Sequence, residues 1–307
     1  MSRLAQAFAK GFDSDLWWSF KNSPVTVASA ILALICIGGA VLAPLLAPHD
    51  VMNLASVQLS DAFKPPAFAD GGESAWPLGS DDQGRDMLSA IMYGGRISLL
   101  VGICAVLFST LVGVAVGLTA GYLGGTLDAL LMRIADVQLT FPSILVAMLV
   151  DGIARAALPQ EVHERIALVV VIFAIGISSW PQFARTVRGS TLVERNKEYV
   201  LAARVIGLSD ARIMFTHVLP NVIGPVLVIA TLNLGFAILT EATLSFLGVG
   251  VPPTQPSLGT LIRIGNDFLM SGEWWIAIFP GMALVAMVLS VNLLGDWLRD
   301  ALNPRLR

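Results

Sequence analysis

Few side chains in this sequence could make or break a covalent bond, and their spacing argues against such chemistry. His163 and Glu164 begin like the His-Glu-x-x-His zinc motif, but no second His follows. Gly295 and Asp296 match the end of the Gly-x-Gly-Asp motif of intramembrane proteases, but position 293 is Leu. No Lys directly follows a Gly, so a nucleotide-binding P-loop is absent. We therefore expect no catalytic residues, metal ligands or cofactor in this chain.

Two carboxylates, Asp136 and Glu241, lie inside long apolar stretches. A charged side chain near the centre of a bilayer costs roughly 2.5–3.5 kcal/mol on insertion scales, so each should face protein or water. They could line the path of a transported substrate. They could instead pair with polar groups of neighbouring helices, for example Asp136 with Arg133. Both interpretations are open at this point.

A charged cluster precedes the second apolar stretch and consists of Asp81, Asp82, Arg85 and Asp86. One interpretation is a docking surface for an external protein, or part of an outer gate. The other is a solvated loop with local ion pairs, which contribute little individually. The residue types alone do not decide between the two.

The elements that must position these groups are apolar. Hydrophobic residues make up 55% of the 307 residues, charged residues only 13%, and the mean hydropathy is +0.75. Soluble domains average about 25% charged residues, so the composition excludes a soluble or disordered protein. The formal charge of −3 provides no field for a polyanion, so we expect no nucleic-acid partner. Cys36 and Cys104 both fall in apolar runs, which favours packing over a disulfide or metal pair.

Six apolar stretches are long enough to cross a bilayer, since a spanning helix needs about 20 apolar residues. The sequence therefore predicts an all-α, polytopic membrane protein with six transmembrane helices. The predicted spans cover residues 24–47, 97–122, 129–150, 166–184, 222–247 and 275–298. Before the first span, apolar residues spaced by four predict an amphipathic helix lying at the membrane interface: Leu4, Phe8, Phe12, Leu16 and Phe20.

The distribution of Lys and Arg predicts the orientation. With the N-terminus inside, thirteen of the 19 basic residues fall in inside segments and six in outside ones, as the positive-inside rule requires. The first outside loop, residues 48–95, holds seven acidic and two basic residues, which suits an outside face. We therefore place both termini in the cytoplasm of a bacterial inner membrane protein.

The loop between the fourth and fifth spans is the most informative stretch. A short helix begins with Glu198 in its first turn, where the helix dipole favours an anion, and ends at Gly207. Ser209 can cap a second helix that should stop near Pro220. Ala203 and Gly207 are four residues apart and predict a face of small residues, open to close approach by another protein. The sequence thus predicts two short helices that project into the cytoplasm.

This loop resembles the cytoplasmic coupling loop of binding-protein-dependent ABC importer permeases. The family pattern is Glu-Ala-Ala, three residues, Gly, nine residues, Ile, one residue, Leu-Pro. The matching residues are Ala202, Ala203, Gly207, Leu219 and Pro220. Leu201 stands where the pattern has Glu, and His217 stands where it has Ile. Glu198 lies one helical turn before Leu201 and could replace the missing acid.

Other stretches narrow the resemblance to the second permease subunit of dipeptide and oligopeptide importers. The resembling segments cover residues 77–86, 94–99, 241–248, 252–257 and 292–305, so the resemblance extends over nearly the whole chain. It implies a type I ABC importer permease core over residues 96–300, with the coupling loop at 198–220. Residues 1–95 would add the interfacial helix, one span and a periplasmic loop.

The resemblance also implies a function and a set of partners. The chain would translocate di- or oligopeptides by alternating access and would hydrolyse no ATP itself. Its partners would be a homologous permease subunit, two cytoplasmic ATP-binding subunits, an external substrate-binding protein and membrane lipid. Members of the family also import nickel chelates, glutathione or antimicrobial peptides, so these substrates are alternatives. A family that moves varied peptides needs no fixed ion site, which favours interhelical roles for Asp136 and Glu241.

Two other classes of protein are weighed against this one. An ATP-independent secondary transporter or channel predicts paired intramembrane carboxylates, whereas this sequence has lone carboxylates and a basic loop. An intramembrane enzyme predicts catalytic pairs, which the spacing above does not provide.

Overall fold

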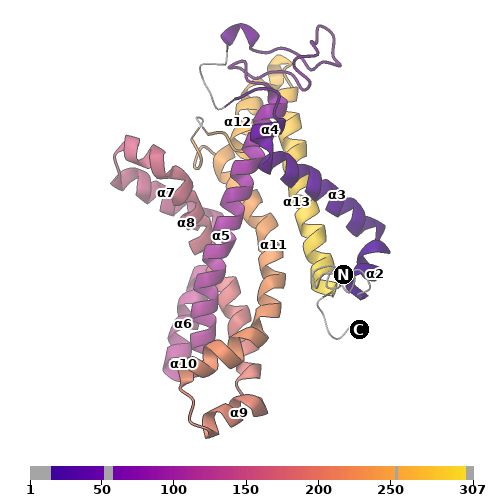
Figure 1. Cartoon of the computed structure of the whole chain (residues 1–307). Helices are drawn as coiled ribbons and strands as arrows, with labels where there is room; N and C mark the ends of the chain where they lie inside the picture. The colour runs from indigo at the N-terminus through magenta and orange to yellow at the C-terminus, as the bar shows by residue number, and fades with distance from the viewer. Residues whose placement is uncertain (1–14, 52–57, 253–254, 302–307) are drawn as a thin grey trace.

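The chain folds into a set of long helices that run between two ends of an elongated molecule (Figure 1). The computed structural model describes residues 15–51, 58–252 and 255–301. Within these ranges the structure contains helices and no β-strand, in agreement with the predicted all-α class. The helices before the second span are α2 (Asp15–Lys21), α3 (Pro24–Val41), α4 (Ala43–Leu46) and the 3-10 turn η1 (Leu59–Asp61).

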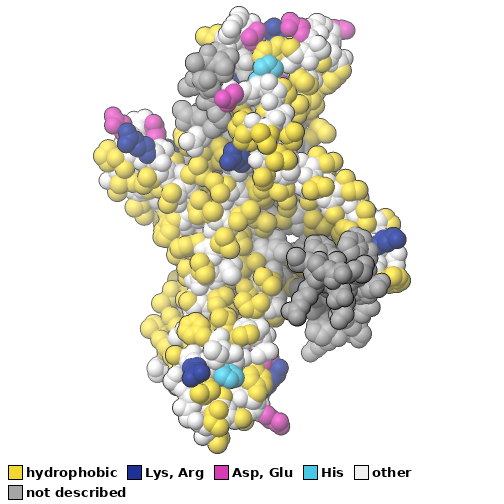
Figure 2. Space-filling model, viewed as in Figure 1, with side chains coloured by type: hydrophobic (Ala, Val, Ile, Leu, Met, Phe, Trp, Pro, Cys, Tyr) yellow, Lys and Arg dark blue, Asp and Glu magenta, His cyan; other side chains and the backbone are white. Residues whose placement is uncertain are grey.

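The remaining helices form the body of the molecule. Its first half contains α5 (Met87–Leu123), α6 (Gly125–Leu139), α7 (Ser143–Ala157) and α8 (Gln160–Glu194). Its second half contains α9 (Glu198–Val205), α10 (Asp210–Ile213), the π-helical turn η2 (Met214–Val218), α11 (Leu219–Phe246), α12 (Leu258–Phe268), η3 (Leu269–Ser271) and α13 (Trp275–Ala301). Hydrophobic side chains cover the middle of the molecule, and charged side chains gather toward its ends and tips (Figure 2).

Five helical stretches of the described chain are long and apolar enough to cross a membrane, and they correspond to five of the six predicted spans. The predicted third span, residues 129–150, is instead a bent pair in which α6 and α7 meet at 92°. Pro142 immediately precedes α7. Proline lacks an N–H and disfavours helical geometry in the residue before it, which favours a break at this point. The chain has six spans if this pair counts as one.

The backbones of α5 and α8 touch along a row of glycines. A Cβ added at Gly113, Gly117 or Gly121 would overlap atoms of α8 between Trp180 and Thr191. The spacing of four places the three glycines on one face of α5. Small residues at this spacing let helices approach closely in a membrane. The pair α5 and α8 therefore forms the central support of the molecule.

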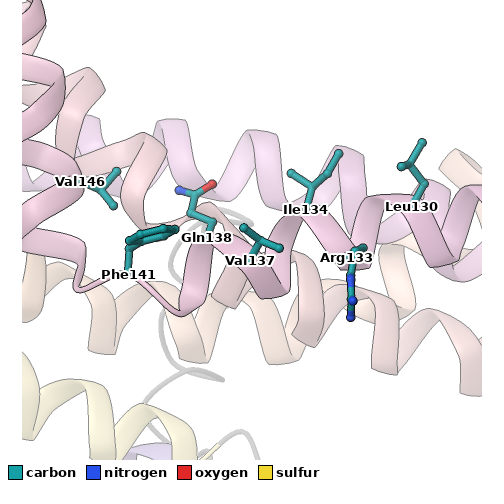
Figure 3. A pocket seen from close by; sticks show the side chains of 7 residues that line it. All are labelled: Leu130, Arg133, Ile134, Val137, Gln138, Phe141 and Val146. Carbon is teal, nitrogen blue, oxygen red and sulfur yellow. The ribbon is translucent and has the colours of Figure 1, made fainter.

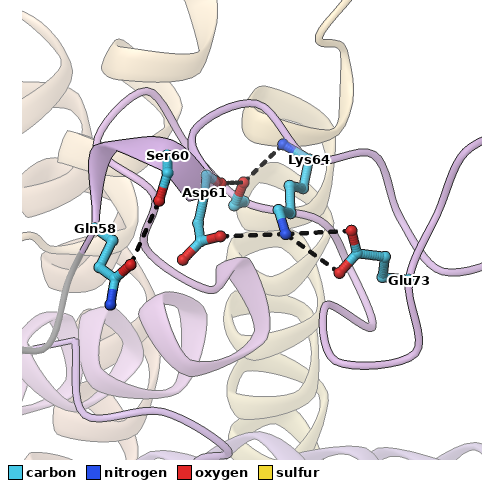
Figure 4. Close-up of polar contacts among 6 residues, drawn as sticks. Gln58, Ser60, Asp61, Lys64 and Glu73 are labelled. Atoms are coloured by element: carbon cyan, nitrogen blue, oxygen red, sulfur yellow. Dashed lines mark hydrogen bonds and ion pairs between the residues drawn. The ribbon is translucent and has the colours of Figure 1, made fainter.

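Residues 58–86, which we call the cap, cover the end of α13. The indole N–H of Trp275 donates to the carbonyl of Ser80 at 3.0 Å. The backbone N–H of Lys64 donates to the Ser80 hydroxyl at 2.8 Å. The Lys64 ammonium pairs with Asp61 at 3.1 Å and with Glu73 at 3.2 Å (Figure 4). Side chains and backbone together thus fix the cap on the helical bundle.

The N-terminal segment is described from residue 15 onward, so the predicted apolar positions Leu4, Phe8 and Phe12 lie outside the described residues. Helix α2 is short, and the ring of Phe20 lies edge-on to Trp297 with centroids 5.3 Å apart. This contact joins α2 to the last turns of α13.

The prediction that the second short helix stops near Pro220 is wrong. Helix α10 continues through the π-helical turn η2 into α11, so residues Asp210–Phe246 form one uninterrupted span. Pro220 occupies the first turn of α11, where a proline is tolerated because its missing N–H costs little. The π turn η2 before it has wider i to i+5 hydrogen bonding, so the helix continues in spite of the N–H that Pro220 lacks. Of the two short helices predicted for this loop, α9 alone is separate from the spans.

Candidate functional site

Helix α9 lies at the extreme end of the molecule, between α8 and α10 (Figure 1). Glu198 stands in its first turn, as predicted, and is exposed. Gly207 follows the helix with φ +82°, the left-handed conformation typical of a glycine after a helix end. Ser209 is the N-cap residue of α10, but its side chain makes no capping hydrogen bond.

The outer face of α9 differs from the predicted face of small residues. Ala203 is only 3% exposed and packs into the chain, so it does not share an open surface with Gly207. The exposed surface is instead bulky and apolar: Val205 is 86% exposed, Ile206 74% and Phe215 62%. Ala202 is exposed beside them. An apolar patch of this kind at the tip of a chain indicates contact with another protein or with a membrane.

A tyrosine hydroxyl connects the α9 region to α5. Tyr122, near the end of α5, is buried, and its hydroxyl donates to Asp210 Oδ1 at 2.8 Å. Arg204 Nε donates to the same hydroxyl at 3.3 Å, and the guanidinium lies 5.0 Å from the ring centroid. Arg195 Nη1 donates to the carbonyl of Gly121 at 2.8 Å. These contacts join α9 and the start of α10 to the end of α5.

A second tyrosine connects α9 to α8 and α11. The Tyr199 hydroxyl donates to Glu194 Oε2 at 2.5 Å and accepts from Asn221 Nδ2 at 3.2 Å. Burial, together with the hydrogen bond to Glu194, raises the pKa of Tyr199 to about 12. Lys197 also pairs with Glu194, at 2.6 Å. The hydroxyl therefore stays protonated at neutral pH and remains a donor.

The last residues of the coupling-loop pattern lie at the start of α11. Leu219 is half-buried and Pro220 is exposed. His217 Nδ1 lies 2.7 Å from the Thr216 hydroxyl, within the π turn that precedes them. These residues are one helix away from α9, rather than on a second projecting helix.

Glu241 is completely buried between three helices. Its carboxylate accepts from the hydroxyl of Ser98 on α5 at 2.6 Å and from that of Ser245 on α11 at 2.7 Å. The Ser98 hydroxyl in turn accepts from the N–H of Leu258, the first residue of α12, at 3.3 Å. Glu241 thus joins α5, α11 and α12.

Asp136 lies on an open face of α6, with 56% of its side chain exposed. The nearest basic group is Arg185 Nη1 on α8 at 3.9 Å, and the pairing with Arg133 suggested by the sequence is not formed. The ionic pair joins α6 to α8, and its exposure makes its contribution to stability small.

Beside Asp136, a groove of about 440 Å³ follows the break between α6 and α7 (Figure 3). It is lined by Leu130, Arg133, Ile134, Val137, Gln138, Phe141 and Val146. The Gln138 side chain holds the end of α6 on α8, accepting from the indole N–H of Trp180 at 2.9 Å and donating to the carbonyl of Ile177. No motif in the sequence pointed to this groove, and the one sequence signal of the break that forms it is Pro142.

The charged cluster in the cap is largely buried. Arg85 Nε donates to Asp81 Oδ2 at 2.6 Å, and both side chains are at most 3% exposed. Asp86 is 1% exposed and caps α5 by accepting from the N–H of Ser89 at 2.9 Å. Asp82 is half-buried, and burial together with Asp81 raises its pKa. The local ion pair of one interpretation is formed between Asp81 and Arg85, but inside the cap rather than in a solvated loop. The docking or gate interpretation stays a prediction.

Comparison with known proteins identifies the class of this protein. The family described as "Binding-protein-dependent transport system inner membrane component" matches residues 113–307. The family "N-terminal TM domain of oligopeptide transport permease C" matches residues 13–66. The chain belongs to the binding-protein-dependent permease family: it is a multi-pass inner-membrane subunit of an ABC importer. Such a permease works with ATP-binding subunits and a substrate-binding protein, and it is a transport component rather than an enzyme.

Individual relatives match the chain over almost its full length. It is 37% identical to the dipeptide transport system permease protein DppC of Haemophilus influenzae, with 95% of each chain covered. It is 40% identical to DppC of Escherichia coli, covering 95% of this chain and 93% of the relative. The glutathione transport system permease protein GsiD of Pectobacterium atrosepticum is 38% identical, with coverages of 95% and 91%.

The fold is similar to that of a solved ABC importer. An inward-facing structure of the MetNI methionine ABC transporter matches with a TM-score of 0.55 and 19% sequence identity. The match covers 71% of this chain and 98% of the other. At this identity the likeness shows the fold alone, and it agrees with the predicted type I permease core. Among the described residues, no group of three or more His, Cys, Asp or Glu side chains could hold a metal ion.

Proposed function

We propose that this chain is the second permease subunit of an importer that moves dipeptides and short oligopeptides across the bacterial inner membrane. The proposal is supported by the relatives named for dipeptide transport and by the match of residues 13–66 to an oligopeptide permease family. The relative named for glutathione transport makes that tripeptide the leading alternative substrate. Uptake through this subunit follows alternating access.

We further propose that α9 docks on one of two ATP-binding subunits in the cytoplasm. The observation that carries this is the exposed apolar surface of Val205, Ile206 and Phe215 at the tip of the molecule. Both termini would then lie in the cytoplasm and the cap in the periplasm. A homologous permease subunit completes a heterodimer, and residues 96–300 form the transport core, preceded by the N-terminal region 1–95.

The contacts around α9 suggest how ATP would drive the helices. Closure of the ATP-binding subunits displaces α9. The Tyr122 hydroxyl passes this displacement to α5, and the Tyr199 hydroxyl passes it to α8 and α11. Because the backbones of α5 and α8 touch, they move together. ATP acts only by favouring one of two conformations of the permease pair.

A charged residue in the apolar patch tests the docking proposal. The assembled importer is purified through its ATP-binding subunit, and recovery of this chain is measured together with ATP-driven uptake of labelled Ala-Ala. Val205→Arg should remove both recovery and uptake while the chain still inserts, because it buries an unpaired charge at the contact. Met270→Arg, a residue 96% exposed at the cap end, is the matched control for recovery. Normal recovery of Val205→Arg would contradict docking through α9.

The substrate is tested by competition. Uptake of labelled Ala-Ala by cells carrying the complete importer should be inhibited by unlabelled dipeptides and tripeptides. Importer-dependent uptake of labelled glutathione without uptake of Ala-Ala would move the assignment to the glutathione alternative. Importer-dependent uptake of a nickel chelate, with no uptake of labelled Ala-Ala or glutathione, would contradict the peptide proposal.

A further inference from the structure

A small polar pocket lies at the opposite end of α8 from the coupling region. It is formed where the α7–α8 turn meets the α11–α12 connection and α12. Its polar lining residues are Arg155, His163, Glu164 and Arg263, and Gly248 and Val251 form part of its wall. The volume is about 120 Å³, well below the roughly 300–1,000 Å³ of pockets that hold a whole small-molecule ligand. This is room for one small polar group rather than for a whole peptide.

Two buried groups hold the α7–α8 side of the pocket. Asp151 is 1% exposed and His163 5% exposed. Asp151 Oδ2 accepts from Arg155 Nε at 2.6 Å. Asp151 Oδ1 lies 3.4 Å from His163 Nε2, and neither of these two atoms has a hydrogen-bond partner among the described residues. Asp151 thus fixes the base of the Arg155 guanidinium and leaves its terminal nitrogens without a bond in the described chain.

The second guanidinium of the pocket belongs to Arg263 and reaches it from α12, opposite the α7–α8 turn. Arg263 on α12 lies against Gly248, which has φ +78°. That φ value is one that only glycine adopts without strain, and a Cβ at Gly248 would stand 2.8 Å from Arg263 Nη1. Among the described residues, Arg263 forms no hydrogen bond or ion pair. Two arginines from distant parts of the chain therefore converge on one pocket with unused donors.

The charge of the pocket limits its ligand. Glu164, whose carboxylate accepts from Gln160 Nε2 at 3.0 Å, adds one negative charge to the lining. Asp151 already pairs with Arg155. Glu164 offsets the charge of Arg263, so the pocket suits a ligand that carries both a carboxylate and a positive charge. Guanidinium groups bind planar carboxylates with two parallel hydrogen bonds.

We propose that this pocket binds a carboxylate, namely the C-terminal carboxylate of the peptide that enters the permease. This rests on the proposed peptide substrate. A terminal carboxylate is common to all peptides, so a site for it accepts varied side chains. The pocket lies on the cap side of the molecule, where the proposed orientation places the periplasm. Arg155 and Arg263 are then substrate-contacting residues, and Asp151 positions Arg155.

The test uses the detergent-solubilised complex of both permeases and both ATP-binding subunits, without the binding protein. Saturation-transfer difference NMR with Ala-Ala should show transfer to the C-terminal residue, and Ala-Ala amide should show little. Arg155→Gln combined with Arg263→Gln should weaken Ala-Ala binding about tenfold or more, since each charge-assisted hydrogen bond is worth roughly a factor of ten. Arg165→Gln changes an exposed arginine of α8 outside the pocket and is the matched control.

The outcomes separate the possible sources of the carboxylate. Equal transfer from Ala-Ala and its amide, or equal binding by the double variant, would overturn the proposal. If the double variant instead weakens only the affinity for the substrate-free binding protein, the carboxylate belongs to that protein and the substrate assignment is wrong. Arg263→Lys, which keeps the charge, should bind Ala-Ala with intermediate affinity and guards against misfolding of the double variant. If the wild type imports Ala-Ala with ATP but shows no Ala-Ala binding in this assay, the carboxylate pocket is contradicted and the proposed function stands. If the wild type does not import Ala-Ala, the proposed function itself is contradicted.

Discussion

The cap and the α9 region, at opposite ends of the same helices, are stabilised in different ways. The cap buries its charges: Asp81 and Arg85 pair inside it, and Trp275 of α13 donates to its backbone. The α9 region leaves large apolar side chains such as Val205 in solvent and is held by tyrosine hydroxyls near its surface. The cap is therefore held by contacts within this chain, whereas the α9 region presents an apolar surface that suits the proposed partner. Substitutions should consequently affect stability at the cap and coupling at α9.

The largest effect on stability is expected at the cap. Asp81→Ala should lower the free energy of unfolding by about 3–5 kcal/mol, because it leaves the Arg85 charge buried without its partner. The measurement is thermal unfolding of the purified complex in detergent. Asp70→Ala, an exposed residue of the cap, is the matched control. A double change of Asp81 and Arg85 to Ala and Met should be less destabilising than Asp81→Ala alone, and equal destabilisation would contradict the buried-pair explanation.

A smaller loss is expected at Glu241, where three helices meet. Glu241→Ala removes the acceptor for two buried hydroxyls, each unsatisfied group costing about 1–3 kcal/mol. Glu241→Gln keeps one acceptor oxygen and should be clearly milder. The same unfolding measurement compares the two variants. If both were as stable as the wild type, the carboxylate would not hold α12 to α5.

At the α9 end, a change at Gly207 should act on coupling. Gly207→Val places a β-branched residue at φ +82°, and the left-handed conformation costs roughly 1–2 kcal/mol. The strain falls on a short exposed helix, so the chain should insert normally while ATP hydrolysis is uncoupled from peptide uptake. Gly207→Asn is the control, since Asn tolerates this conformation. Uptake and hydrolysis as tightly coupled in the Val variant as in the wild type would contradict the proposed role.

The smallest effect is a pH dependence confined to alkaline conditions. The pKa of Tyr199 is raised to about 12 in the folded protein, above its ordinary value of about 10. The hydroxyl thus stabilises the fold fully below pH 10, and this contribution is lost as the pH rises from 10 through 12. Unfolding measured between pH 8 and pH 11.5 should show a steeper loss in the wild type than in Tyr199→Phe. Identical slopes would place the Tyr199 hydroxyl outside the link between α9 and α8.

The sequence predicted the spans well because a membrane helix needs only a sufficient apolar length. It predicted a single third span because Pro142 is compatible with a kinked membrane helix, and the 92° bend between α6 and α7 is seen only in the structure. It placed Pro220 at a helix end for the same local reason, although the π turn before it allows the helix to continue.

The sequence pattern located the coupling loop, but it did not predict which side chains form the exposed surface of that loop. The spacing of Ala203 and Gly207 predicts that they share a helical face. Whether that face is exposed depends on how α9 packs on α5 and α11, and the spacing of residues within α9 carries no information on this packing. The burial of Asp81 and Arg85 likewise depends on the cap folding back on α13. The carboxylate pocket was missed entirely, because Arg155 and Arg263 are more than a hundred residues apart in the sequence.

Helix α8 has 35 residues, so at 1.5 Å per residue it extends over about 50 Å. From Gly176 to Thr191 it is pressed against α5, whereas its first turns stand away from α5 beside α7 and carry His163 (Figure 1). Pro181 lies within the clamped portion. The contact with α5 extends almost to Glu194, so α8 and α5 are expected to shift as one rigid unit. In the proposed mechanism, the displacement that Tyr199 passes to Glu194 would therefore also move the first turns of α8, about 50 Å away, and with them the carboxylate pocket.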